Sequence, residues 1–201
     1  LHSTSRRQRQ MCIRDRKDVN GDFSGVIYDE NAQTLTLFRD HMGIRPLYYY
    51  ADNSFMAFST DIRGLLGLDG VDSSLNEDWI YRTLSGYFVD SVTSTEYQNI
   101  FCVSPASYIT FSIKNEKISQ EIHSYWQLGK KKIHYTSFEL YKAKLKELVT
   151  DSIQRRLQAI PGKAGAELSG GLDSGVIGIL IHRLGRDCVY SVSYTHLRAH
   201  E

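Results

Sequence analysis

The chain has 201 residues, of which 24 are lysine or arginine and 23 are aspartate or glutamate, so its formal net charge is +1. This near-neutral balance gives no sign of nucleic-acid binding, and no apolar run approaches the roughly 20 residues that a membrane span needs. Of the three cysteines, Cys12 lies near the start of the chain, and Cys102 and Cys188 have neither metal-ligand spacing nor the pattern of a disulfide framework, so we expect a reduced, cytoplasmic protein.

The two ends of the chain are predicted to derive from adapter DNA joined to the gene. Back-translation of Met11–Arg16 gives ATG TGT ATA AGA GAC AGx, and the reverse complement of this DNA encodes residues 191–196. One element in both orientations, similar to a transposon end used in library preparation, therefore explains both segments. We expect residues 1–16 and 192–201 to pack against nothing, and residues 17–191 to be an internal fragment of a longer protein.

Residues 17–128 are predicted to form an α+β domain that begins with short strands. β-Branched and aromatic residues between polar turns predict an antiparallel meander, whose strands are expected at 23–28, 34–39, 47–50 and 55–58. Short helices are expected at 61–68 and 76–84. Residues 107–113 alternate like a further strand, which would pair with 117–125 across a turn at Asn115.

Residues 129–135 are predicted to be a linker, and residues 136–191 to begin an α/β domain. A capping box of Thr136 and Glu139 opens a long amphipathic helix, which Pro161-Gly162 ends. Its apolar residues recur at helical spacing: Phe138, Tyr141, Leu145, Leu148, Val149, Ile153 and Leu157. A strand ending at Leu168, a glycine-rich turn, a helix that opens near Ser174 and a strand around Val189 follow, and the helix contains the apolar segment 176–184.

The turn Ser169-Gly170-Gly171-Leu172-Asp173-Ser174 has the composition of a phosphate-binding loop. Adjacent glycines let the backbone approach an anion and turn N–H groups toward it, and the helix opening near Ser174 adds its positive dipole end. Ser169 and Ser174 offer hydroxyl donors, and the Asp173 carboxylate could hold Mg²⁺ beside the phosphates. The lysine-bearing motif G-x-x-x-x-G-K-[ST] is absent, which disfavours a kinase or GTPase of that class. An ordinary strand-to-helix turn is the competing interpretation.

This turn resembles the loop of the ATP pyrophosphatases, which split ATP between the α and β phosphates. A second motif lies upstream, Arg39-Asp40-x-x-Gly43-Ile44-Arg45-Pro46-Leu47-Tyr48, preceded by residues 21–29, GDFSGVIYD. On its residues alone it is a well-tied β-turn, yet it closely resembles a segment of class II glutamine amidotransferase domains. Such a domain followed by SGGLDS resembles the layout of the asparagine synthetase family.

The resemblance implies the back part of an N-terminal-nucleophile glutaminase β-sandwich, followed by the start of a Rossmann-like ATP pyrophosphatase domain with a parallel sheet. It implies that ATP or its pyrophosphate binds at Leu168, Ser169, Gly170, Gly171, Leu172, Asp173 and Ser174, with Mg²⁺ on Asp173. It assigns no catalytic residue within the fragment, because the glutaminase nucleophile of the family is an amino-terminal cysteine. Cys102 has no free amino group and is expected to be a core residue.

In the longer protein, the resemblance implies that ATP, Mg²⁺, aspartate and glutamine yield asparagine, glutamate, AMP and pyrophosphate through β-aspartyl-AMP. It allows a homodimer, with no nucleic-acid or membrane partner. One alternative is an amide-forming relative without glutaminase activity, such as a β-lactam synthetase or lasso-peptide cyclase. Another is a non-catalytic fragment. A cysteine directly after the initiator methionine of the intact gene product would favour the glutamine-dependent synthetase.

Overall fold

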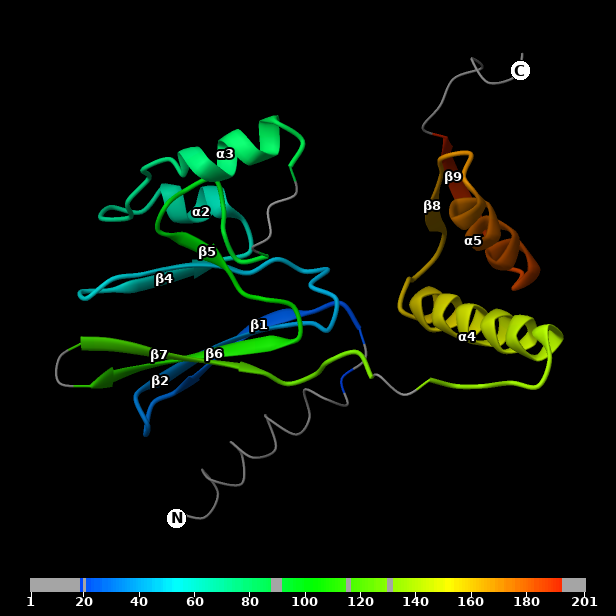
Figure 1. Cartoon of the computed structure of the whole chain (residues 1–201), viewed down its shortest axis with the longest axis horizontal. Helices are drawn as coiled ribbons and strands as arrows, with labels where there is room; N and C mark the ends of the chain where they lie inside the picture. Colours follow the sequence, from blue (N-terminus) through cyan, green and yellow to red (C-terminus); the bar gives the residue numbers. More distant parts are fainter. Residues whose placement is uncertain (1–18, 20, 88–91, 115–116, 130–131, 193–201) are drawn as a thin grey trace. The chain divides into compact units, whose positions relative to one another are not determined.

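The computed structural model describes residues 19, 21–87, 92–114, 117–129 and 132–192. The chain divides into two compact units, Leu1–Gly129 and Lys130–Glu201 (Figure 1). The predicted adapter segments fall outside the described residues except for Val192, and so does the predicted turn at Asn115. The described residues contain both α-helices and β-strands, so the prediction of a mixed α and β protein is confirmed.

The first unit contains two antiparallel sheets. Four strands form one sheet in the order β1-β2-β6-β7, with bounds Ser24–Asp29, Thr34–Arg39, Ser107–Lys114 and Lys117–Ser124. Three strands form the other in the order β4-β3-β5, with bounds Met56–Ser59, Tyr48–Ala51 and Ile100–Cys102. Figure 1 shows the two sheets as layers, with helices α2 (Ile62–Leu66) and α3 (Glu77–Leu84) beyond the three-stranded sheet.

The predicted meander is wrong, although its strands are present close to the expected positions. β1 pairs with β2, and β3 with β4, but β2 takes β6 as its second partner and β3 takes β5. Alternating side chains identify a strand without identifying its partner, and here the partners lie far away along the chain. The three-residue strand β5 was not predicted, because so short a run carries little periodic signal.

A core between the two sheets explains this pairing. Leu37, Ile109 and Phe111 from the four-stranded sheet join one buried cluster with Tyr49, Leu47 and Val103. The next residue along β3, Tyr50, points the opposite way and joins Leu65 of α2 and Ile100 of β5 in a second cluster. β3 therefore buries both of its faces, and α2 covers the face that the other sheet does not.

The second unit contains two helices and a parallel pair of strands. Helix α4 (Phe138–Gln158) is followed by β8 (Ala164–Leu168), α5 (Leu172–Arg183) and β9 (Cys188–Val192). β8 and β9 are parallel, with Leu168 opposite Val192. The strand thus includes the first residue of the predicted adapter segment, because backbone pairing needs no particular side chain. Ile153 and Leu157 of α4 pack with Leu180 and Ile181 of α5 in the core of this unit.

Helix α4 differs from its prediction in two respects. Its N-cap is Ser137, whose hydroxyl accepts the N–H of Leu140, so the cap lies one residue beyond the predicted Thr136 and the predicted capping box does not form. The apolar stripe is buried only toward its C-terminal end. Phe138 and Leu145 are 77% and 64% exposed.

None of the helices in the described part of the chain combines the length and the hydropathy that crossing a lipid bilayer requires.

Candidate functional site

The glycine-rich turn lies between the end of β8 and the first turn of α5. Gly170 has φ +76, a left-handed conformation that glycine adopts without steric cost. Gly171 is the N-cap and makes no side-chain capping bond. The helix therefore begins at Leu172, two residues earlier than predicted, and the N–H groups of its first turn have no partner within the helix.

This boundary changes the position of Asp173. The residue lies in the first turn of α5 instead of preceding the helix, and Gly171 occupies the capping position. Asp173 therefore cannot be the N-cap of α5. An exposed carboxylate remains beside the N–H groups of the first turn, where a negative charge is favoured by the helix dipole.

Two serine hydroxyls hold the turn in shape. Ser174 Oγ accepts the backbone N–H of Ser169 at 3.2 Å and donates to the carbonyl oxygen of Gly171, also at 3.2 Å. The hydroxyl oxygens of Ser169 and Ser174 lie 3.2 Å apart. These contacts tie the end of β8 to the first turn of α5 across a connection of three residues.

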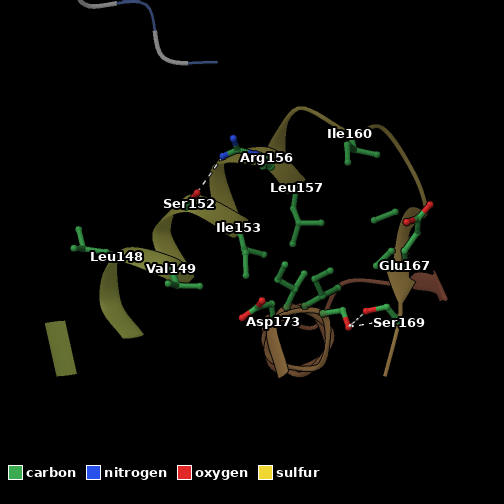
Figure 2. Close-up of a pocket in the computed structure, with 16 residues that line it drawn as sticks. Leu148, Val149, Ser152, Ile153, Arg156, Leu157, Ile160, Glu167, Ser169 and Asp173 are labelled. Carbon is green, nitrogen blue, oxygen red and sulfur yellow. Dashed lines mark hydrogen bonds between the residues drawn. The ribbon is translucent and has the colours of Figure 1, made fainter. Parts of the chain in front are cut away.

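A pocket of about 790 Å³ opens beside this turn (Figure 2). It lies between α4, β8 and α5, all of which belong to the second unit. Figure 2 shows Ile153 and Leu157 extending from α4 toward α5, with Ser169 and Asp173 at the opposite wall. The residues around it are Leu148, Val149, Ser152, Ile153, Arg156, Leu157, Ile160, Ala164, Gly165, Ala166, Glu167, Ser169, Asp173, Ser174, Ile177 and Ile181.

The pocket brings together only part of the predicted site. Ser169, Asp173 and Ser174 line it, whereas the remaining predicted residues of the turn do not. Leu168 turns toward α5, where its side chain lies against Gly178, and Leu172 is 88% exposed. The pocket is also lined by the polar residues Ser152, Arg156 and Glu167, which could not be selected from the sequence because none belongs to a motif. Arg156 donates to Ser152 at 3.0 Å.

The second motif, Arg39 to Tyr48, forms a tightly bonded turn between the two sheets. The Asp40 side chain is 1% exposed, and its carboxylate accepts the N–H groups of Met42, Ile44 and Arg45, each at 3.0 Å. Burial alone would raise the pKa of Asp40, but these backbone hydrogen bonds outweigh it and the pKa lies below its ordinary value. The interpretation of most of this motif as a well-tied turn is confirmed.

Arg39 completes the turn by donating to groups on both sides of it. Its guanidinium bonds the carbonyl oxygens of Gly43, Arg45 and Val103 and the thiol sulfur of Cys102. Gly43 has φ +69, and a Cβ there would lie 2.8 Å from the ring of Pro105, so only glycine fits without movement. Cys102 is 7% exposed, as its prediction as a core residue requires.

Within the described residues, no group of three or more histidine, cysteine, aspartate or glutamate side chains is arranged to hold a metal ion. Asp173 is the acidic side chain of the predicted phosphate loop. Mg²⁺ at phosphate sites commonly uses one or two protein carboxylates, with phosphate oxygens and water completing its shell. The side chains present therefore fit a metal that arrives with a phosphate ligand, and not one held by protein alone.

The chain is similar to a known domain family and to several known proteins. Residues 9–126 match the family described as "Glutamine amidotransferase domain". The chain is 29% identical to "Putative asparagine synthetase [glutamine-hydrolyzing] 2" of Methanocaldococcus jannaschii, over 82% of this chain and 32% of that protein. It is 30% identical to asparagine synthetase [glutamine-hydrolyzing] 3 of Bacillus subtilis, over 79% and 25%. Amidase chry2 of Gibberella zeae is also 30% identical, over 82% and 24%.

The chain spans about a third or less of the relatives named above. An alignment over 82% of 201 residues is also longer than the first unit, which ends at Gly129. The similarity therefore continues into the second unit, which carries the glycine-rich turn.

Proposed function

The chain belongs to the glutamine amidotransferase domain family, and from this premise we propose that it is part of a glutamine-dependent asparagine synthetase. In the proposed reaction, ATP activates aspartate as β-aspartyl-AMP with release of pyrophosphate, and ammonia from glutamine converts this intermediate to asparagine. The observation that carries the proposal is the Ser169–Ser174 turn at the N-terminus of α5, following an amidotransferase domain in the same chain. The names of the two synthetase relatives support it.

The proposed ligand of the turn is the triphosphate of ATP. The first-turn N–H groups of α5 and the hydroxyls of Ser169 and Ser174 would donate to phosphate oxygens. Asp173 would hold a Mg²⁺ ion, and the bound ion would supply positive charge beside the oxygens of the pyrophosphate leaving group. Donors already fixed by the Ser169–Ser174 contacts would need little reorganisation to stabilise that charge.

The finer fold assignment belongs to the same proposal. We infer that the two stacked antiparallel sheets are the back part of an N-terminal-nucleophile glutaminase sandwich. The parallel β8–β9 pair with α5 would be the first βαβ unit of an ATP pyrophosphatase domain. The layering of the sheets and the β8–α5–β9 order support these assignments.

We assign no glutaminase nucleophile among the described residues. Cys102 is buried and bonded by Arg39, and Cys188 lies within strand β9. Neither cysteine carries the free α-amino group that an N-terminal nucleophile uses as its base. Aspartate and glutamine as substrates, a homodimeric assembly and a cytoplasmic location remain predictions.

The proposal is tested by measuring Mg²⁺-pyrophosphate binding to the chain and to Asp173→Asn by isothermal titration calorimetry. Asparagine keeps the shape and loses the charge, so we expect binding to weaken by about tenfold or more, as charge-assisted and metal contacts typically require. Without Mg²⁺, the wild type should bind pyrophosphate no more tightly than Asp173→Asn does.

Asp187→Asn is the matched control, because Asp187 is an exposed carboxylate of the same unit that pairs with Lys163 at 3.2 Å. It should bind Mg²⁺-pyrophosphate within about twofold of the wild type, since surface ion pairs contribute little. Equal binding by Asp173→Asn and Asp187→Asn would remove Asp173 from the site. No binding by the wild type would contradict the phosphate loop itself.

A further inference from the structure

Helix α5 meets the side chain of Leu168, the last residue of strand β8, at Gly178. This glycine is buried, and a Cβ at its position would lie 3.2 Å from Leu168 Cδ2 and 3.4 Å from Tyr190 Cε1. Gly175, one turn earlier in the same helix, has nothing within 4 Å of the equivalent point. Glycine is a poor helix former, so its presence at 178 calls for a packing reason that Gly175 does not share.

Strand β9 contributes a second contact at the same point. The hydroxyl of Tyr190 donates to the carbonyl oxygen of Gly178 at 3.2 Å. Gly178 therefore meets β8 through Leu168 and β9 through Tyr190. Tyr190 of β9 pairs with Ala166 of β8, so these contacts pack the helix against both strands of the parallel sheet.

The Leu168 side of this contact directly precedes the glycine-rich turn along the chain. Leu168 is the last residue of β8, and the N–H of the following residue, Ser169, donates to Ser174 Oγ in the first turn of α5. Only residues 169–171 connect the strand to the helix. A shift of α5 away from β8 must therefore be absorbed within these residues, whose N–H directions would change.

We propose that Gly178 is a positioning residue for the phosphate loop. Its contact with Leu168 and Tyr190 sets the separation of α5 from β8, and this separation fixes the conformation of residues 169–171. The effect on the loop stands on the geometry alone. The effect on binding rests on the proposed function, since it requires the loop to bind phosphate.

The test compares Gly178→Val with the matched control Gly175→Val, both in the full chain. Hydrogen exchange of the Ser169 amide, measured without ligand, reports loop order, and calorimetry reports Mg²⁺-pyrophosphate binding. Gly178→Val should accelerate Ser169 exchange and weaken binding, each by about tenfold or more, as small misplacements of a preorganised site do. Gly175→Val should leave both within about twofold, because its side chain enters open space.

If Gly178→Val does not fold, a pair of milder substitutions, Gly178→Ala and Leu168→Val, tests the same contact. Gly178→Ala adds only the Cβ, and Leu168→Val removes the end of the side chain that this Cβ meets. If the contact transmits the effect, Leu168→Val should restore slow Ser169 exchange to a chain carrying Gly178→Ala. A merely structural effect on helix stability would not be rescued at position 168.

Unchanged Ser169 exchange in both Gly178 variants, or a defect that Leu168→Val fails to repair, would overturn the positioning role. Absence of pyrophosphate binding in the wild type would contradict the proposed function only. In that case the exchange measurements still decide whether Gly178 orders the loop.

Discussion

Asp40 and Asp173 lie in or beside glycine-containing motifs, yet their carboxylates have opposite surroundings. Asp40 is buried, and the backbone N–H groups of its own turn occupy its oxygens. Asp173 is exposed and lines the pocket beside α5. The first is arranged to hold a loop, and the second remains accessible to a ligand. The two aspartates therefore call for different tests.

The Asp40 turn should depend on pH and on the charge of this residue. Asp40→Asn replaces one acceptor oxygen by an NH₂ group, which cannot accept a backbone N–H. We expect it to lower the free energy of unfolding by about 1–3 kcal/mol at pH 7. Denaturant unfolding of the two proteins, followed by a probe in the first unit, measures the difference.

Since the folded-state pKa of Asp40 is lowered, its stabilisation is complete above the unfolded-state pKa near 3.8. It is lost as pH falls through the lower folded-state pKa. The gap between wild type and Asp40→Asn should therefore be constant from pH 7 to about pH 5 and close at lower pH. A gap that persists unchanged to pH 2 would show that the carboxylate charge is not responsible.

At the scale of the elements, helix α4 was predicted correctly, but its N-cap was predicted one residue too early. Thr136 and Ser137 are both good capping residues, and the Thr136–Glu139 spacing favours the earlier one. The structure selects Ser137, with an extended backbone at φ −146 and ψ 158. Leu140, not Glu139, then occupies the third helical position, so no reciprocal capping box forms.

Ser137→Ala should therefore destabilise the first turn of α4, by about 1 kcal/mol. The sharpest measurement is hydrogen exchange of the Leu140 amide, which donates to Ser137 Oγ. The free-energy change corresponds to an exchange rate about fivefold faster. Thr136→Ala is the control and should leave this rate unchanged. Faster Leu140 exchange in Thr136→Ala than in Ser137→Ala would instead support the predicted cap at Thr136.

Helix α5 and strand β8 illustrate a relation that depends on packing between elements. The turn between them has only three residues, so its shape is set by where the helix sits on the strand. Gly178, ten residues beyond Leu168, makes the contact that fixes this position. A site can thus be shaped by a residue outside its motif.

For the whole molecule, the division into two units predicts where proteases first cut between residues 22 and 191. Residues 132–135 form neither helix nor strand, and they follow the division between Gly129 and Lys130. Proteases cut where the backbone can open without breaking a core. Limited trypsin digestion should therefore yield fragments cut at residues 130–132 before any fragment cut within β1–β4 or α4.

Lysine and arginine residues inside the folded units serve as internal controls for this digestion. Arg39 and Arg45 lie in the bonded turn, and Lys144 and Arg155 lie on α4. Intact-mass analysis at early times distinguishes these cuts. First cleavage at Arg39 or Arg45 would contradict the proposed linker.

Much of this organisation can be predicted from the sequence, because local signals are sufficient for it. Alternating residues identify β2 and β6 close to their observed bounds, and the helical spacing identifies α4. The motifs around Gly43 and Gly170 identify two turns, and in the structure both glycines have a left-handed backbone. The family was predictable for the same reason, since its motifs are short and contiguous.

Only the tertiary structure decides how these pieces meet. The pairing of β2 with β6, against the predicted meander, depends on a core whose members are far apart in sequence, among them Leu37 and Phe111. The pocket beside the turn combines β8 and α5 with residues of α4 that belong to no motif, such as Ser152 and Arg156. Periodicity and turn chemistry act within a few residues of the chain. Packing acts between elements, and it selected the partners of each strand and the position of α5 at Gly178.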